Sequence, residues 1–390
     1  MIIFLVLINN FISVMPGMNL DSVFIMAKTG DTIFVKNGIY NANAEEYIEN
    51  ICGNCVEPLT EVRTTVGFHI KDKGLVIIGE NRDSTILVTN AGYGLLFENC
   101  DVYISNLTVT GGKRSSDGNA TDAGIVIKES RAIVNNIAVI NNTHRIDTVV
   151  VGVGGIFGRE GAEIYISNCL IYNNTWDGIA LYRGASAVIA DNIIKKGRGA
   201  GIGITWDASA LIFCNFISEY WKGIGCFGNS IAVVMNNAVF DNLGWGIIAT
   251  GNTYMKIMNN VIYHNGNCGF AVWDSNSVGI FENNIVADNG WKEEWVCPCV
   301  GAWMNGIFEQ FPIKFNDFWK NKAGNYQGIP DLTGKYGNIS ADPKFDQKSF
   351  VLQQNSPCID AGDSLIIDLD GSRSDMGIYG GPGGKKEKLW

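Results

Sequence analysis

The sequence is poor in proline, histidine and charge. Eight prolines and three histidines occur among 390 residues, and charged residues make up only 17%. His69, His144 and His264 lie far apart and form neither a triad nor a set of metal ligands. The net charge of −10 disfavours binding to nucleic acid or to anionic lipid. We therefore expect neither as a partner. The acidic charge also disfavours a strongly polyanionic substrate, unless a local basic patch overrides the average.

Long hydrophobic runs are also lacking. The apolar run near the N-terminus, residues 2–8, is too short to cross a bilayer, which takes about 20 residues. It has the character of the apolar centre of a secretory signal, although no Lys or Arg precedes it. We predict a signal segment over residues 1–17, no membrane span, and a protein that is secreted or held at the cell surface. A buried first strand is the alternative.

The ten cysteines do not form a recognisable disulfide framework. Cys52-Gly-Asn-Cys55 and Cys297-Pro-Cys299 resemble the two halves of a zinc site. They are separated by about seven of the repeats described next, so we favour local disulfides or free thiols and assign no metal ligands.

A glycine followed by an apolar residue recurs along the middle of the chain, mostly every 22 or 23 residues. The glycines are Gly124, Gly155, Gly178, Gly201, Gly223, Gly246 and Gly269. A second landmark keeps step about 13 residues later. It consists of Asn106, Asn136, Asn168, Asn192, Asn215, Asn237, Asn260, Asn284 and Asn316. Two landmarks in register over about 200 residues indicate a repeat protein.

Each repeat contains three short strand patterns. In residues 178–192, Ile179 and Leu181 alternate with Ala180 and Tyr182, and two further short apolar runs follow. Three strands in about 23 residues fit a coil in which each strand pairs in parallel with its copy one coil on. The sequence therefore predicts an all-β solenoid, a single-stranded parallel β-helix of about ten coils. The asparagines are expected to form a stacked column, because Asn tolerates left-handed turns and amides bond along such a stack.

The two ends carry a family resemblance. Residues 20–40 are similar to the capping helix, first strand and Gly-x-Tyr of the pectin-lyase-like superfamily, and residues 341–345, 350–363 and 368–381 resemble the tail of its exported bacterial members. The resemblance implies a right-handed β-helix over 18–340 with an N-terminal cap, and a C-terminal cap and tail over 341–390.

The chemistry of that superfamily is less clearly matched. Its uronate lyases use a cationic base near a calcium held by carboxylates, so calcium is the candidate cofactor. Asp368-Leu-Asp370-Gly371 looks like the start of a calcium loop, but a turn closing the last coil is the favoured interpretation. No catalytic motif of the pectate lyases or polygalacturonases is present.

The first strand of each repeat indicates where a ligand would bind. Positions 1 and 3 after each glycine are apolar and face inward, so positions 2 and 4 face outward. Large aromatic side chains on both rims of this outward face are suited to stacking on sugar rings. We expect the substrate-binding residues to be Trp176, Tyr182, Trp206, Trp221 and Trp273. The alternative is that loops between the coils, such as residues 142–152 and 291–300, cover them.

The densest charged cluster on this face supplies the candidate catalytic residues Arg159, Asp177, Arg183 and Asp207. Arg159 or Arg183 would act as the base of a β-eliminating lyase, and Asp177 with Asp207 as the acid–base pair of a hydrolase. The sequence thus predicts a monomeric carbohydrate-active protein that acts on a polysaccharide laid along the helix. The alternative is a non-catalytic surface protein that binds glycan or serves as a spacer.

Overall fold

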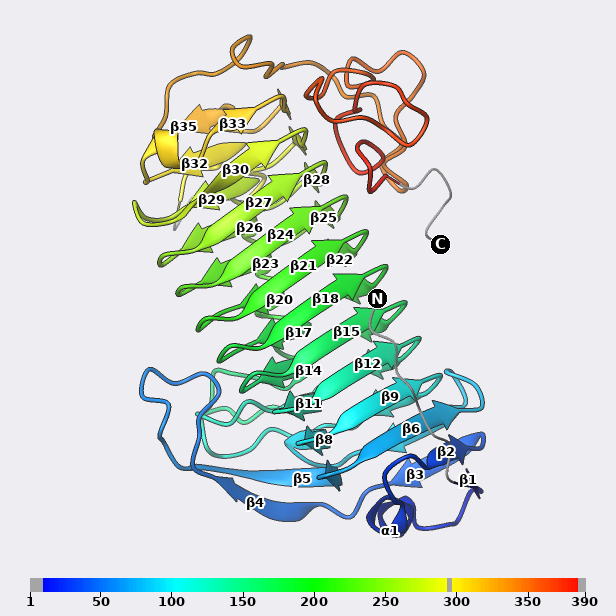
Figure 1. Cartoon of the computed structure of the whole chain (residues 1–390). Coiled ribbons are helices and arrows are strands. Elements are labelled where there is room, and N and C mark those ends of the chain that lie inside the picture. Colours follow the sequence, from blue (N-terminus) through cyan, green and yellow to red (C-terminus); the bar gives the residue numbers. More distant parts are fainter. Residues whose placement is uncertain (1–9, 293–296, 385–390) are drawn as a thin grey trace. The chain divides into compact units, whose positions relative to one another are not determined.

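The computed structural model in Figure 1 describes residues 10–292 and 297–384. The chain divides into two compact units, Met1–Val188 (unit 1) and Ile189–Trp390 (unit 2). Each unit is a right-handed parallel β-helix, so the predicted all-β fold is confirmed. None of the described helices is long and apolar enough to cross a membrane.

In unit 1 the coils supply strands to three parallel sheets, here named A, B and C. Sheet A contains β1 (Phe11–Val14), β2 (Thr32–Val35), β6 (Gly74–Gly79), β9 (Asp101–Ser105), β12 (Arg131–Asn135) and β15 (Glu163–Ser167). Sheet B contains β3 (Gly38–Asn41), β7 (Thr85–Val88), β10 (Thr108–Thr110), β13 (Ala138–Ile140) and β16 (Leu170–Tyr172). Sheet C contains β5 (Val62–Lys71), β8 (Tyr93–Glu98), β11 (Ala123–Lys128), β14 (Gly154–Arg159) and β17 (Ile179–Leu181).

Unit 2 repeats this arrangement, and β18 (Ser186–Ala190) lies at the division. Its sheet A contains β21 (Ser209–Phe213), β24 (Ile231–Met235), β27 (Tyr254–Met258), β30 (Val278–Glu282) and β33 (Ile313–Lys314). Its sheet B contains β19 (Ile193–Lys195), β22 (Phe216–Ser218), β25 (Ala238–Phe240), β28 (Val261–Tyr263), β31 (Ile285–Ala287) and β34 (Asp317–Trp319). Its sheet C contains β20 (Ala200–Ile204), β23 (Lys222–Phe227), β26 (Trp245–Thr250), β29 (Phe270–Val272), β32 (Ala302–Met304) and β35 (Tyr326–Gln327). A short 3-10 helix, η1 (Phe308–Gln310), precedes β33.

The inward positions are those that the repeat predicted. In unit 1, Ile125, Ile156 and Ile179 pair in register across β11, β14 and β17, and all three are fully buried. In unit 2, Ile202 and Ile224 do the same across β20 and β23. Because each strand bonds to the same strand of the next coil, one apolar residue per coil builds a continuous core column.

The asparagines do not form the single column that the sequence suggested. In unit 1 Asn106, Asn136 and Asn168 have left-handed backbones, with φ of 59°, 51° and 55°. In unit 2 the left-handed residue stands one position before each landmark asparagine, for example Asn259 before Asn260. The predicted register is therefore wrong by one residue from Asn192 onward.

The asparagines of the unit 2 column are buried and bonded to one another. Their side-chain amides donate to the amide oxygen of the next coil over 2.9–3.1 Å. The column consists of Asn192, Asn215, Asn237, Asn260, Asn284, Asn316 and Asn338. The buried position, rather than the left-handed one, allows each amide to bond both its neighbours and the turn backbone.

At the N-terminal end, α1 (Leu20–Met26) begins after Asn19, whose side chain accepts the Ser22 N–H at 2.9 Å. Its buried Phe24 packs edge-on against Phe68 of β5. Part of the predicted signal segment, β1, pairs in parallel with β2. The apolar run at residues 2–8 lies outside the described residues.

The C-terminal tail packs against the outer face of sheet B in unit 2. Phe350, Cys358 and Met376 join a buried cluster with Phe216 of β22 and Val261 of β28. The tail therefore covers apolar side chains that point out of several coils, which goes beyond closing the last turn. Among the described residues, the cluster that the tail forms includes no side chain of sheet C.

Candidate functional site

The outer face of sheet C in unit 1 carries a column of charged side chains. Lys71, Glu98, Lys128 and Arg159 end four neighbouring strands and lie in register. Lys71 Nζ and Lys128 Nζ lie 3.2 and 4.0 Å from the Glu98 carboxylate. A hydrogen bond from His69, aided by Lys71 and Lys128, lowers the pKa of Glu98 to about 2. The column holds three cations and one carboxylate, so it needs a carboxylate from outside the column to balance its charge.

A segment inserted between coils covers the Arg159 end of this column. The antiparallel strand β4 (Glu45–Glu49) and the loop after it bring Glu49 and the Ile51 carbonyl over Arg159. The Arg159 guanidinium donates to Glu49 Oε1 at 2.7 Å, to Tyr93 Oη at 2.9 Å and to Thr121 Oγ1 at 2.7 Å. Arg159 is 0% exposed. The expectation that Arg159 lies on an open face is therefore wrong, because an insertion outside the repeat folds over it.

The next coil places the other predicted residues of unit 1. Tyr182 is buried, packs edge-on against Phe157 and donates to Asp177 Oδ2 at 3.5 Å. Burial, with the Asp177 charge, raises the pKa of Tyr182. Tyr182 therefore offers no open stacking surface, while Trp176 and Asp177 are half-buried.

Arg159 and Arg183 are the two cations predicted to be catalytic, and of these Arg183 is the one that stays partly exposed. Its Nε donates to the Cys52 carbonyl over 3.4 Å, and Cys52 forms a disulfide with Cys55. The local disulfide that the sequence favoured is therefore present for this pair. Cys297 and Cys299 belong to unit 2 and are buried there.

Trp206 and Asp207 lie in unit 2, on the turn after β20, with φ of 54° and 65°. The Trp206 ring is half-buried and lies against Gly228, and the Asp207 N–H donates to the Gly228 carbonyl at 3.2 Å. Asp207 is exposed. Since Asp177 and Asp207 belong to different units, their action as an acid–base pair stays a prediction.

Sheet C of unit 2 presents a row of tryptophans on its outer side. Trp221, Trp245, Trp273 and Trp303, together named the aromatic strip, come from four successive coils. Their ring centroids lie 5.8, 5.9 and 4.9 Å apart in turn, each pair edge to face. The four rings do not occupy equivalent positions of the repeat, because Trp245 pairs in register with Lys222 and Trp303 pairs with Ala271. Their large side chains, rather than the register alone, bring the rings into contact.

Loop residues cover the strip only in part. Trp245 is 5% exposed, and its Nε1 donates to Cys297 Sγ at 3.0 Å. Trp221, Trp273 and Trp303 are each half-buried. Each of the two predictions about the tryptophans therefore holds for part of the strip. The loop packs on Trp245, whereas Trp221, Trp273 and Trp303 keep part of their surface exposed.

Two cations border the aromatic strip. Lys292 Nζ lies 4.8 Å from the centroid of Trp221, and Lys222 Nζ lies 5.3 Å from that of Phe227. Asp274, next to Trp273, accepts hydrogen bonds from the Thr250 hydroxyl and the Gly251 N–H, which lower its pKa although its burial opposes this. The strip therefore combines ring faces with charged groups that can bond hydroxyls.

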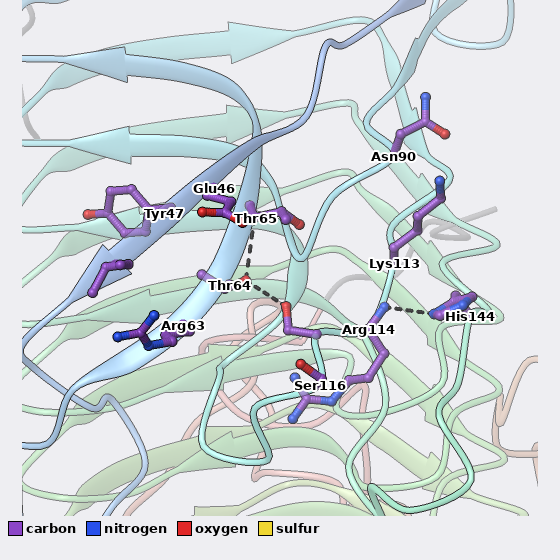
Figure 2. A pocket seen from close by; sticks show the side chains of 12 residues that line it. Glu46, Tyr47, Arg63, Thr64, Thr65, Asn90, Lys113, Arg114, Ser116 and His144 are labelled. Carbon is purple, nitrogen blue, oxygen red and sulfur yellow. Dashed lines mark hydrogen bonds between the residues drawn. The ribbon is translucent and has the colours of Figure 1, made fainter.

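Unit 1 also holds a polar pocket that the sequence analysis did not single out (Figure 2). Its volume is about 440 Å³, within the range of about 300–1,000 Å³ for ligand pockets. One wall is the hairpin of β4 and β5, and the other is formed by the loops that follow β7, β10 and β13. It is lined by Glu46, Tyr47, Ile48, Arg63, Thr64, Thr65, Asn90, Lys113, Arg114, Ser115, Ser116 and His144.

A buried ion pair fixes the floor of this pocket. Asp122 pairs with Arg114 and also accepts from the Ser115 and Thr64 hydroxyls at 3.0 and 2.9 Å. The other Arg114 donors bond backbone carbonyls, among them Ala120 at 3.0 Å. These residues lie in insertions that interrupt the 23-residue spacing. The pocket therefore could not be predicted from the periodicity of the sequence.

The segment that resembles the start of a calcium loop makes internal hydrogen bonds, as the favoured interpretation of a turn expects. Asp368 accepts the backbone N–H groups of Asp375 and Gly381, and Asp370 accepts from the Ser372 hydroxyl at 2.6 Å. These contacts are those of a turn. Across residues 10–292 and 297–384, no cluster of three or more His, Cys, Asp or Glu has the arrangement of a metal site.

The family described as "Right handed beta helix region" matches residues 48–216 and 154–318, which together exceed half of the chain. The chain belongs to the right-handed β-helix family. No curated protein matches this β-helix protein.

Several solved structures resemble this β-helix protein. The pectate lyase Pel9A aligns over 96% of both chains with a TM-score of 0.52 and 15% identity. The A-module of the Azotobacter vinelandii mannuronan C-5 epimerase AlgE4 covers 83% of this chain and 94% of its own, with a TM-score of 0.45 and 11% identity. The PL6 family alginate lyase AlyGC covers 97% of this chain and 58% of its own, with a TM-score of 0.42 and 13% identity. At these identities the likeness shows the fold alone.

Proposed function

We propose that this β-helix protein binds a polysaccharide along the outer face of sheet C and acts on it as a lyase or hydrolase. The observation that carries the proposal is the aromatic strip. Its four tryptophans come from successive coils, three of them are half-buried, and a lysine lies over the ring of Trp221. A polymer of repeating sugars can contact such a row of rings at several points, and such weak contacts add up.

Stacking is the contact that these rings favour. An exposed indole face costs free energy in water, and a sugar ring offers an apolar face of similar size that would cover it. Lys222 and Asp274 then provide a donor and an acceptor for hydroxyl groups near the rings. The pectate lyase named above has a polysaccharide substrate, but its likeness bears on the fold, so the proposed ligand class depends on the strip.

For the chemical step we propose Arg183, Asp177 and Asp207 as the groups that contact substrate, because each retains exposed side-chain surface. Arg183 would be the base of a β-elimination, whereas Asp177 and Asp207 would serve a hydrolysis. Arg159 takes a positioning role instead, since its donors hold the segment that covers it.

We also propose that the protein is exported, to the outside or to the cell surface, and acts as a monomer. The Cys52–Cys55 disulfide supports this location, because disulfides persist in oxidising compartments and are rare in the cytosol.

The test is a screen against uronate and neutral polysaccharides. Binding is read by affinity electrophoresis, lyase activity by absorbance of unsaturated products, and hydrolase activity by new reducing ends, each with and without added calcium. We expect retardation by at least one polymer and turnover of the same polymer. Retardation without turnover would establish the second candidate, a glycan-binding module, whose support is the strip alone. An absence of retardation across the panel would reject both.

A further inference from the structure

We infer that the unit 1 pocket of Figure 2 binds the anionic group of a sugar, either a carboxylate or a sulfate ester. The inference depends on the proposed function for its ligand class, a glycan, and adds a second, charge-selective contact. It concerns residues outside the aromatic strip and outside the predicted catalytic set.

The first support is an unneutralised cation. Lys113 is exposed, and its ammonium group makes neither a hydrogen bond nor an ion pair with any residue that the structure describes. Its backbone N–H donates to the Ala91 carbonyl at 2.8 Å, so the main chain at this point is fixed while the three ammonium donors stay available. Figure 2 shows Lys113 and His144 on the same wall.

The second support is the tautomer of His144. Its Nδ1 accepts the backbone N–H of Arg114 at 3.0 Å, so the ring proton of the neutral imidazole resides on Nε2. His144 therefore offers one N–H donor beside the Lys113 ammonium. A donor pair of this kind matches the oxygens of a carboxylate or sulfate group.

Most charged groups at the pocket are already paired with one another. The Asp122 carboxylate beneath the pocket is consumed by Arg114 and by the Ser115 and Thr64 hydroxyls, so it offers little negative charge to a ligand. Glu46 is the one carboxylate in the lining. Arg63 pairs with Glu61 at 2.8 Å, so Lys113 and Glu46 are the charged groups of the lining that have no ion-pair partner among the described residues.

The uncharged residues of the lining favour a sugar over a bare ion as the ligand. Ser116, Thr65 and Asn90 bring hydroxyl and amide groups, while Tyr47 and Ile48 bring apolar surface. A bare ion would use only the donors, whereas a charged sugar would contact all of these groups. The volume of about 440 Å³ also exceeds what a small ion requires.

The experiment is a titration of the full chain with single sugars, in which binding is measured by isothermal calorimetry or NMR. The probes are glucuronate, glucose 6-sulfate and neutral glucose. We expect at least one anionic sugar to bind about tenfold or more tightly than glucose, with affinity falling as salt is added. Glucuronate or glucose 6-sulfate as the tighter probe identifies the anion. Equal affinity for all three sugars, or no binding of either anionic sugar, would overturn the inference.

Three variants and a control localise the binding. Lys113→Met should lower the affinity for the preferred anionic sugar about tenfold. His144→Asn should lower this affinity several-fold, while the amide oxygen of the new asparagine still accepts the Arg114 N–H. Glu46→Gln should strengthen binding, because it removes the like charge. Lys28→Met, which removes an exposed lysine of unit 1 outside the pocket, should leave affinity unchanged. Parent-like affinity in Lys113→Met would place the site elsewhere.

The outcome is separable from that of the proposed function. Polymer retardation that depends on the aromatic strip, without binding of the single anionic sugars, would defeat this inference alone. Binding of the anionic sugars without retardation by any polymer would defeat the proposed function and leave the pocket assigned.

Discussion

Glu49 and Arg159 stand 110 residues apart in the sequence, and their side chains form a buried ion pair with 2.7 Å between Oε1 and Nη1. The second carboxylate oxygen of Glu49 binds Lys128 Nζ at 3.1 Å. One carboxylate thus holds an insertion against the ends of two strands of the helix. Gly53, in the same insertion, lies so close that a Cβ there would come within 2.9 Å of Arg159 Nε.

We expect Arg159→Met to lower the free energy of unfolding by about 3–5 kcal/mol, because it leaves the Glu49 carboxylate buried beside a single cation. Urea unfolding followed by circular dichroism measures the loss. Arg131→Met is the matched control, since the Arg131–Asp101 pair is exposed and should contribute less than about 1 kcal/mol. Equal losses in the two variants would contradict the buried role of Arg159.

We expect Asn260→Ala to lower the free energy of unfolding by about 3 kcal/mol or more. Asn260 donates to the carbonyls of Val234 and Met258, and its oxygen accepts from the backbone and side chain of Asn237. Its removal leaves several buried groups without partners, at about 1–3 kcal/mol each.

The matched control for the column is Asn276→Ala, an exposed asparagine with an ordinary backbone, for which a change below about 0.5 kcal/mol is expected. Thermal unfolding compares the two variants. A midpoint for Asn260→Ala that matches the control would show that the column adds little to stability.

Asp317 gives the protein a pH-dependent stability of known sign. Burial raises the pKa of Asp317 from 3.8 to about 7. Between these values the folded state keeps a proton that the unfolded state has lost, so stability falls as pH rises, by up to ~1.4 kcal/mol per unit from this group. We expect the parent to lose stability relative to Asp317→Asn between pH 4 and 7, as measured by urea midpoints.

The control for this profile is Asp83→Asn, whose carboxyl group is largely exposed. Its pH dependence should follow that of the parent. A constant difference between the parent and Asp317→Asn from pH 4 to 7 would mean that Asp317 titrates alike in the folded and unfolded chain.

For ligand binding, we expect Trp273→Ala to weaken polysaccharide retardation about fivefold, corresponding to about 1 kcal/mol for one aromatic contact. Trp303→Ala should act similarly. Tyr254→Ala removes an exposed aromatic ring from sheet A and should leave binding unchanged. Parent-like binding by both tryptophan variants, with circular dichroism intact, would move the site off the aromatic strip.

The sequence by itself determined the coil and the inward columns. Residues such as Ile202 and Ile224 contact each other one coil apart, and that spacing is written in the repeat. The aromatic strip does not follow from the period, because Trp221, Trp245 and Trp273 stand 24 and 28 residues apart and occupy different positions of their coils. The position within the turn was misjudged, because several coils carry asparagine at both adjacent positions, as at Asn259 and Asn260.

Tertiary structure alone decided what covers the coils. Glu49 reaches Arg159 across 110 residues and Lys128 across 79, separations that share no period with the repeat. Lys113 and His144 become neighbours of the hairpin through insertions whose path no pattern reports. A repeat determines the contacts between equivalent positions of successive coils. The position of an insertion depends instead on where its own charged and apolar side chains find partners. That choice determined which predicted site residues are buried and which stay open.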